Sequence, residues 1–207
     1  MTPERKARIQ AVAATRQPDL TVFMERVHKP HNVSAVLRTC DAVGVMRAHA
    51  VPVEGGLPKL NHTSGGAQRW VELERHQESS SGLKELKNQG FRLYAAHFSD
   101  AAIDYREPDY TQPTAIVMGT EKHGVSEQTS AQVDQHIIIP MHGMAQSLNV
   151  SVATALILYE AQRQRQLAGM YKPKSLTEDP WKSLAEAWIQ RDLARYKTTP
   201  RENSDKQ

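Results

Sequence analysis

The sequence predicts an α/β fold, with a mostly parallel sheet flanked by helices and short helical extensions at both ends. From residue 19 onward, short apolar runs alternate with segments of helical spacing, which is typical of strands joined by helical crossovers. The 207 residues suffice for one well-buried domain with appendages. We therefore expect a basic helical N-terminal extension at residues 1–17, an α/β domain at residues 18–168, and a basic helical extension and tail at residues 169–207.

Short apolar runs predict five strands. They lie at Leu20–Val27, Ala48–Val53, Phe91–His97, Ala115–Met118 and His136–Ile139. Between them, apolar residues at helical spacing predict four helices. These lie at Val33–Ala42, Ser81–Lys87, Ser126–Gln132 and Asn149–Gln166. The junctions from strand to helix are short, as expected for a sheet built from βα units.

Two segments fall outside this alternation. Residues 54–68 contain four glycines and a proline, so we expect a long irregular loop, and such loops in compact domains are usually functional or disordered. Residues 171–207 contain an amphipathic segment in which Trp181 and Trp188 lie seven positions apart. That spacing indicates packing on one helix face rather than stacking on nucleotide bases.

Positive charge gathers at the two ends of the chain. The net charge is +3, but residues 1–17 carry four Lys or Arg against one acid, and residues 161–207 carry ten against six. The ends therefore sum to +7 and the residues between them to −4. This distribution fits ends that bind a polyanion, although solvation of helical surfaces by Lys and Arg explains it equally well.

Composition argues against several classes of protein. No apolar run approaches the roughly 18 residues that cross a bilayer, and the N-terminus lacks the apolar core of an export signal. We therefore expect a cytoplasmic protein without a membrane partner. Cys40, the only cysteine, leaves no intramolecular disulfide or Cys-rich zinc site and is expected to be a packing residue. The histidines show no metal-binding spacing, so we expect no metal.

A first polar cluster lies where the first strand gives way to a helix. Asn32 is placed there as a helix N-cap, a position that asparagine favours. Arg38 follows six residues later, nearly two helical turns along. Because its neighbours Val36 and Leu37 are apolar, a guanidinium pointing outward from this helix suits a phosphate or a carboxylate.

A second candidate is the loop that follows the apolar strand at residues 115–118. It is bounded by Gly119 and Gly124, and loops at the carboxyl ends of parallel strands are where ligands bind in open α/β sheets. Any tight turn can use glycine, so the pattern alone is weak. The P-loop and the G-x-G-x-x-G dinucleotide motif are both absent from the sequence.

The third candidate spans residues 137–153. An apolar strand is broken by Pro140, passes through a small loop around Gly143, and enters a long helix at a Ser/Asn start. A helix N-terminus with free N–H groups can bind a polar or anionic ligand. As secondary structure alone, the segment is a strand, a turn and a capped helix.

In this order, the three segments resemble the three motifs of the SpoU/TrmH branch of the SPOUT methyltransferases. That family carries Asn-x5-Arg, then Gly-x-Glu-x-x-Gly, then Ile-Pro-Met leading into Ser-Leu-Asn-Val-Ser-x-Ala, and every motif position matches here. The resemblance covers about residues 18–170. Residues 17–22 and 160–166 are similar to those members that methylate guanosine 18 of bacterial tRNA.

The resemblance implies a trefoil knot at the C-terminal side of the sheet, which binds S-adenosylmethionine. It assigns cofactor contacts to Ala96, Gly119, Ile139 and Leu148. It also implies a homodimer in which the partner's first motif completes each active site, and the apolar face of the helix at residues 149–166 is a plausible contact. We expect the basic ends to bind tRNA. The candidate RNA contacts are Arg5, Lys6, Arg8, Arg16, Arg163 and Arg165.

The implied reaction is methyl transfer to the ribose 2′-OH of guanosine 18. The resemblance gives Arg38 the central role, supported by four residues. These are Asn32, Glu121, Ser147 and Asn149. Arginine is a poor base because it stays protonated, so we interpret Arg38 as a cation that grips the adjacent phosphate and stabilises the developing alkoxide. Glu121 is expected to hold Asn32 or Arg38 in place rather than to take the proton.

Three alternatives remain open. A 2′-O-methyltransferase of ribosomal RNA usually carries an additional N-terminal RNA-binding domain, whereas about 17 residues precede the core here. A non-catalytic RNA-binding protein is less favoured because the five catalytic motif residues are intact. A methyltransferase of small molecules or proteins is the least favoured, because it gives the basic ends no purpose. Four histidines next to the motifs could be nominated as bases, but we expect surface roles. They are His28, His31, His123 and His142.

Overall fold

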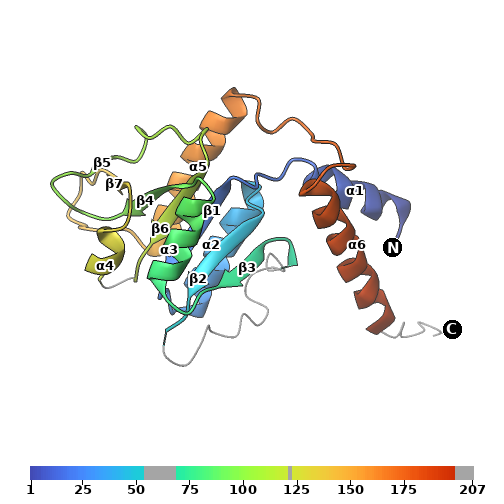
Figure 1. The fold of residues 1–207 in the computed structure, drawn as a ribbon, viewed down its shortest axis with the longest axis horizontal. Coiled ribbons are helices and arrows are strands. Elements are labelled where there is room, and N and C mark those ends of the chain that lie inside the picture. The colour runs from blue at the N-terminus through green and yellow to red at the C-terminus, as the bar shows by residue number, and fades with distance from the viewer. Residues whose placement is uncertain (54–68, 121–122, 199–207) are drawn as a thin grey trace. The chain divides into compact units, whose positions relative to one another are not determined.

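The computed structural model describes residues 1–53, 69–120 and 123–198 (Figure 1). The chain divides into two compact units, one formed by residues 17–171 and the other by residues 1–16 together with 172–207. The first unit begins one residue before and ends three residues after the α/β domain expected from the sequence. The expected loop at residues 54–68 lies outside the described residues, as does Glu121.

The larger unit contains a seven-stranded sheet in the order β3-β2-β1-β6-β4-β7-β5. The strands are β1 (Leu20–Glu25), β2 (Arg47–Val51), β3 (Glu72–Arg75), β4 (Arg92–Ala96), β5 (Ile103–Asp104), β6 (Thr114–Met118) and β7 (Gln135–Ile138). All six pairings between these described strands are parallel. The predicted α/β fold with a mostly parallel sheet is therefore confirmed, with β3 and β5 as two strands that the sequence did not predict.

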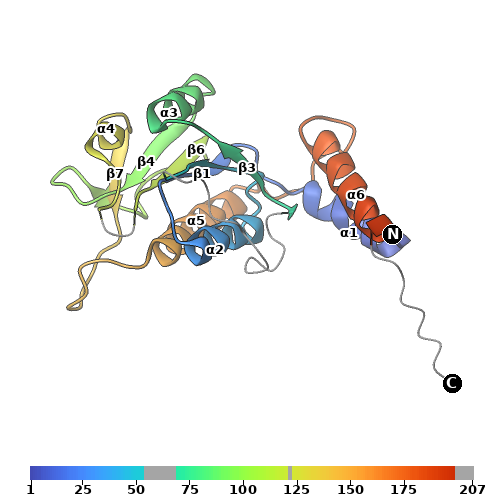
Figure 2. The same cartoon turned by 90° about the horizontal axis from the view of Figure 1, so that it is seen from below.

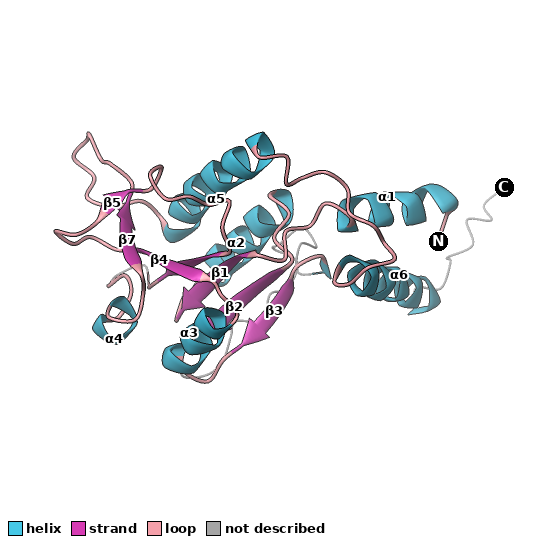
Figure 3. Ribbon diagram, turned by 45° about the horizontal axis from the view of Figure 1, so that its top comes forward, coloured by secondary structure: helices cyan, strands magenta, loops and turns pink. Residues whose placement is uncertain are grey.

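Helices cover both faces of this sheet (Figures 2 and 3). On one face lie α2 (Pro30–Ala42) and α5 (Val150–Leu167), and on the other lie α3 (Ser79–Asn88) and α4 (Glu127–Ser130). Every residue of β1 is buried, including Thr21 and Glu25, and its other four residues are apolar, as expected of a strand covered on both faces. Val22 and Met24 join the core cluster under α2 and α5, whereas Phe23 joins the cluster under α3.

The helix α2 begins earlier than the sequence predicts. Pro30 is its first residue, and Lys29 occupies the N-cap without a side-chain hydrogen bond to the helix. The prediction that Asn32 caps this helix was therefore wrong. Proline has the fixed φ that suits the first helical position, so the helix starts before Asn32 and places that side chain within its first turn. In α5, by contrast, Asn149 is the N-cap and accepts a hydrogen bond from the Ser151 amide.

The smaller unit contains α1 (Pro3–Ala13) and α6 (Trp181–Thr198). Trp188 is buried, and the guanidinium of Arg16 lies 4.9 Å from its ring centre. The Trp181 ring nitrogen donates to the Arg16 carbonyl at 2.9 Å. The packing role expected for both tryptophans is therefore confirmed. Among the helices described, none is both long and apolar enough to cross a membrane.

Candidate functional site

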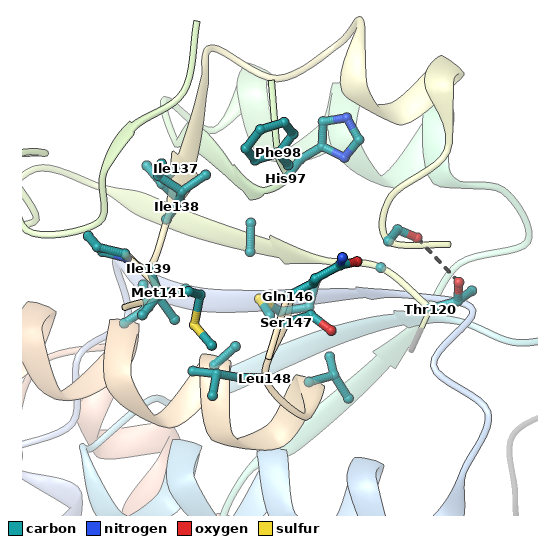
Figure 4. A pocket seen from close by; sticks show the side chains of 18 residues that line it. His97, Phe98, Thr120, Ile137, Ile138, Ile139, Met141, Gln146, Ser147 and Leu148 are labelled. Atoms are coloured by element: carbon teal, nitrogen blue, oxygen red, sulfur yellow. Dashed lines mark hydrogen bonds between the residues drawn. The ribbon is translucent and has the colours of Figure 1, made fainter. Parts of the chain in front are cut away.

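A cavity of about 450 Å³ opens at the carboxyl ends of β4, β6 and β7 (Figure 4). This edge of a parallel α/β sheet is where ligands characteristically bind. Its walls come from the three loops that follow these strands and from the start of α5. The four residues expected to contact a cofactor all line it. They are Ala96, Gly119, Ile139 and Leu148.

The cavity combines apolar walls with a few polar groups. Met118, Ile137 and Ile157 contribute apolar surface alongside the residues just named. Polar side chains enter from Thr120, Gln146 and Ser147, and His97 and Phe98 lie across the cavity from Leu148 (Figure 4). Such a volume and lining suit a small molecule that has an apolar body and a few polar groups.

The loop after β6 is held closed by backbone contacts. Thr120 and Gly124 exchange two hydrogen bonds, from the Thr120 amide at 2.8 Å and from the Gly124 amide at 2.9 Å. A Cβ atom on Gly119 would lie 1.9 Å from the carbonyl carbon of Gly124. Only glycine therefore fits at this position, because a side chain would separate the two sides of the loop that forms one cavity wall.

An amide pair joins the first and third motif segments. Asn149 donates through Nδ2 to Oδ1 of Asn32 at 3.2 Å, and its own Oδ1 accepts from the Ser151 amide at 2.9 Å and from the Ser151 hydroxyl at 2.6 Å. Because these two bonds fix the Asn149 oxygen toward α5, its nitrogen must face Asn32. The chain thus brings together two residues that lie 117 positions apart.

Two further predicted catalytic residues, Ser147 and Arg38, are exposed. Ser147 is exposed on the cavity wall, two residues before Asn149. Arg38 is exposed on α2, and within the described residues no hydrogen bond or ion pair engages its guanidinium. Its charge is therefore available to an anionic ligand. Arg38 shares helix α2 with Asn32, whereas Asn149 is the N-cap of α5.

His97 is a cavity residue that the sequence did not single out. Its ring packs edge-on against His136, with ring centres 5.1 Å apart, and burial together with the His136 charge lowers the pKa of His97. His97 is therefore neutral near pH 7. The only sequence signal was its place directly after Ala96 at a strand end. The four histidines expected at the surface are all exposed. They are His28, His31, His123 and His142.

The structure corrects two of the candidate RNA contacts. Arg165 is fully buried and donates to the Tyr110 carbonyl at 2.8 Å and to the Asp19 carboxylate at 2.5 Å. Arg16 is also buried, beneath Trp188. Neither guanidinium can reach an RNA backbone, because both are enclosed in protein. Charge counting did not reveal this, since it cannot distinguish a buried arginine from an exposed one.

The other candidate RNA contacts are accessible. Lys6 and Arg8 are exposed on α1. Arg5 pairs with Asp192 at 3.1 Å, and Arg163 pairs with Glu160 at 2.7 Å while more than half of its side chain stays exposed. Each arginine keeps part of its side chain accessible, 38% for Arg5 and 59% for Arg163, whereas the carboxylates that they pair with are largely buried. An incoming phosphate can therefore reach either guanidinium from its exposed side.

A second cluster of polar side chains lies on β2 and β3, away from the residues that line the cavity. His49 Nδ1 and His76 Nε2 are 2.9 Å apart, and Glu74 lies 3.8 Å from the same His49 nitrogen. Burial, followed by the charges of His76 and Arg47, lowers the pKa of His49 to about 4. Arg47 also binds Glu74 at 3.1 Å. This arrangement favours a direct hydrogen bond between the rings over a shared metal ion.

Comparison with known proteins identifies relatives over most of the chain. Residues 19–159 match the SpoU rRNA Methylase family. A tRNA (guanosine(18)-2′-O)-methyltransferase of Thermus thermophilus is 52% identical over 190 residues, which cover 92% of this chain and 98% of that one.

Solved structures share the fold. The TrmH/SpoU tRNA modifying enzyme of A. aeolicus superposes with a TM-score of 0.86 at 44% identity, covering 92% of this chain and 97% of that one. The SpoU methyltransferase AviRb of Streptomyces viridochromogenes, in complex with the cofactor AdoMet, superposes with a TM-score of 0.66 at 26% identity. That match covers 74% of this chain and 64% of the other.

Proposed function

The chain belongs to the SpoU rRNA Methylase family, and on that premise we propose that it transfers a methyl group from S-adenosylmethionine to the ribose 2′-OH of guanosine 18 in tRNA. The observation that carries the proposal is the cavity lined by residues between 96 and 157, which gathers residues of the second and third motifs and all four expected cofactor contacts. The guanosine 18 assignment rests on relatives with this activity that match over almost their whole length.

The cavity fits S-adenosylmethionine in chemistry as well as in volume. Ile139 and Leu148 provide apolar surface for an adenine ring, and the bare backbone at Gly119 permits close approach of a ligand. Gln146 and Ser147 offer polar groups to the ribose and the amino acid part. When bound, S-adenosylmethionine supplies the sulfonium methyl group. We propose that the three loops form the trefoil knot typical of the family.

We assign Arg38 the task of holding the RNA. Its guanidinium is exposed and permanently charged, so it grips a phosphate next to the target ribose and stabilises negative charge that develops on the 2′-oxygen. The amide pair of Asn32 and Asn149 keeps the first turn of α2 against the start of α5. It thereby positions Arg38 relative to the cavity. Glu121, outside the described residues, remains a proposed support for Asn32 or Arg38.

We propose that the basic ends bind the tRNA body. Residues 1–17 and 169–207 serve this role, and residues 18–168 form the methyltransferase domain. The retained contacts are Arg5, Lys6, Arg8 and Arg163. We propose that the protein acts in the cytoplasm, in keeping with a tRNA substrate.

We also propose a homodimer that uses the outer face of α5. Val152, Leu156 and Tyr159 are exposed there at successive helical turns, with between 39% and 53% of each side chain accessible. An exposed apolar stripe of this kind marks a surface that another protein covers. A second copy seated on α5 would bring its own α2 toward the cavity, because α2 packs beside α5.

Transfer of labelled methyl from S-adenosylmethionine to an unmodified tRNA transcript tests the proposal. We expect the wild-type protein to label the transcript. We expect no label with Arg38→Ala or with a transcript that carries 2′-deoxyguanosine at position 18. Methylation of the deoxy transcript would show that another nucleotide is the target. Binding of tRNA without any transfer would support a non-catalytic RNA-binding protein, and label on ribosomal RNA alone would indicate the rRNA enzyme.

A further inference from the structure

A buried carboxylate lies at the end of β1, beside the proposed cofactor site. Glu25 is the last residue of that strand and only 4% exposed. Side chains alternate along a strand, so Glu25 points to the same face as Phe23, toward α3 and α4. An ionised carboxylate is costly to bury unless donors surround it.

Four hydrogen bonds converge on Glu25. Its Oε2 accepts from the Ser126 amide at 2.7 Å. Its Oε1 accepts from the hydroxyls of Ser126 at 2.8 Å, Thr129 at 2.6 Å and Ser79 at 2.9 Å. Burial alone would raise the pKa of Glu25, but these bonds outweigh it and lower the pKa below the ordinary value. Glu25 is therefore a carboxylate at neutral pH.

The donors tie Glu25 to the loop that forms the cavity wall. Ser126 lies two residues after Gly124, which is bonded to Thr120 across the loop. The strand register pairs Met24 with Met118, so Glu25 lies level with the start of the same loop at residue 119. One carboxylate thus lies level with the first residue of this loop and holds Ser126, at its end, by two hydrogen bonds.

The next residue links Glu25 to α2, the helix that carries Arg38. Arg26 adopts a φ of +53°, which is uncommon for a residue other than glycine, and its amide donates to the Val51 carbonyl at 3.0 Å. This turn directs the chain from β1 into α2, which carries Asn32. Backbone conformations of this kind persist only where the surroundings hold them.

We propose that Glu25 is a positioning residue that holds residues 123–126, against Thr120, in the shape that binds S-adenosylmethionine. The inference rests on the proposed function only for the identity of the ligand. Glu25 is not among the residues that line the cavity. It acts through Ser126, whose amide and hydroxyl it holds.

The test is Glu25→Gln, measured by amide hydrogen exchange and by calorimetric titration with S-adenosylmethionine. The amide group has one acceptor oxygen for four donors, so we expect exchange at Ser126 and Gly124 to accelerate about tenfold or more, and the Kd for S-adenosylmethionine to rise by a similar factor. Thr129→Val removes one donor and keeps the shape, so it should give a smaller change in the same direction. If Glu25→Gln fails to fold, the same two measurements on Thr129→Val test the proposal.

The matched control is Val45→Ala. Val45 is fully buried just before β2, at the amino ends of the parallel strands, whereas Glu25 lies at the carboxyl end of β1. Its truncation therefore destabilises the domain without touching the loop. Exchange at Ser126 that stays slow in Glu25→Gln, or that accelerates equally in Val45→Ala, would overturn the proposal. Faster exchange with an unchanged Kd would also overturn it. A third outcome separates the two proposals. If exchange accelerates in Glu25→Gln but the wild type does not bind S-adenosylmethionine, Glu25 still holds the loop, and the proposed function is refuted instead.

Discussion

Replacing Gly119 with alanine tests whether the cavity depends on close contact across its loop. The added Cβ atom would lie 1.9 Å from the carbonyl carbon of Gly124, 2.0 Å from its oxygen and 2.1 Å from the Val125 nitrogen. All three are backbone atoms, so no side-chain rotation relieves the overlap. The φ of Gly119 is outside the left-handed region, so the penalty comes from lack of space alone.

The free-energy cost of Gly119→Ala comes from the backbone that must move to make room for the added Cβ atom. Carbon atoms in contact need about 3.5 Å or more, so the two sides of the loop must separate and lose the two hydrogen bonds between Thr120 and Gly124. Each bond contributes about 0.5–1.5 kcal/mol net, so restoring the binding shape costs about 1–3 kcal/mol. We therefore expect the Kd for S-adenosylmethionine to rise about 5- to 150-fold.

Calorimetric titration of Gly119→Ala beside Gly143→Ala measures this effect. A Cβ atom on Gly143 meets nothing within 4 Å, although this glycine also lies in a loop next to the cavity. The control variant should bind S-adenosylmethionine as the wild type does. An unchanged Kd in Gly119→Ala would refute the argument from space, and equal weakening in both variants would show that any added side chain in these loops is harmful.

Three further predictions concern the buried cation, the histidine pair and the exposed helix face. Arg165→Met should lower the free energy of unfolding by about 3–5 kcal/mol, because it leaves buried acceptors without a partner; weaker tRNA binding at unchanged stability would contradict this. The folded pKa of His49, about 4 against an ordinary 6.5, means that the unfolded state binds more protons, so stability is complete above pH 6.5 and about 3 kcal/mol is lost as the pH falls to 4. Denaturation of His49→Gln across this range should lack that slope, and a slope equal to that of the wild type would exclude His49 as its source. Leu156→Glu should convert the proposed dimer to a monomer in sedimentation experiments, and a variant that stays dimeric would place the interface elsewhere.

The strands that the sequence predicts are those whose burial shows as apolar runs. Residues 20–25 and 114–118 are buried throughout, so hydrophobicity alone reveals them. The strand at residues 72–75 is Glu-Leu-Glu-Arg at the edge of the sheet, and it pairs with β2 through its backbone. No local pattern reports such a strand, because its existence depends on a neighbour that is distant in sequence.

The same distinction applies to the residues of the candidate site: those in local motifs were predicted, and those whose partners are distant in sequence were not. Motif residues 119, 139 and 148 were found because their resemblance to a family is local in sequence. Glu25 was hidden inside a predicted strand, since its donors Ser79 and Thr129 lie 54 and 104 positions away. Arg165 was misassigned for the converse reason, because its buried acceptors also lie far along the chain.

The position of β6 in the sheet has a consequence for biosynthesis. This strand pairs with β1 on one side and β4 on the other, yet residues 114–118 are made after both neighbours. Until they leave the ribosome, β1 and β4 each present an unpaired, largely apolar edge. Open edges of this kind are prone to associate with other chains. A nascent chain whose residues 114–118 are still inside the ribosome should therefore depend on chaperones more than one in which these residues have emerged.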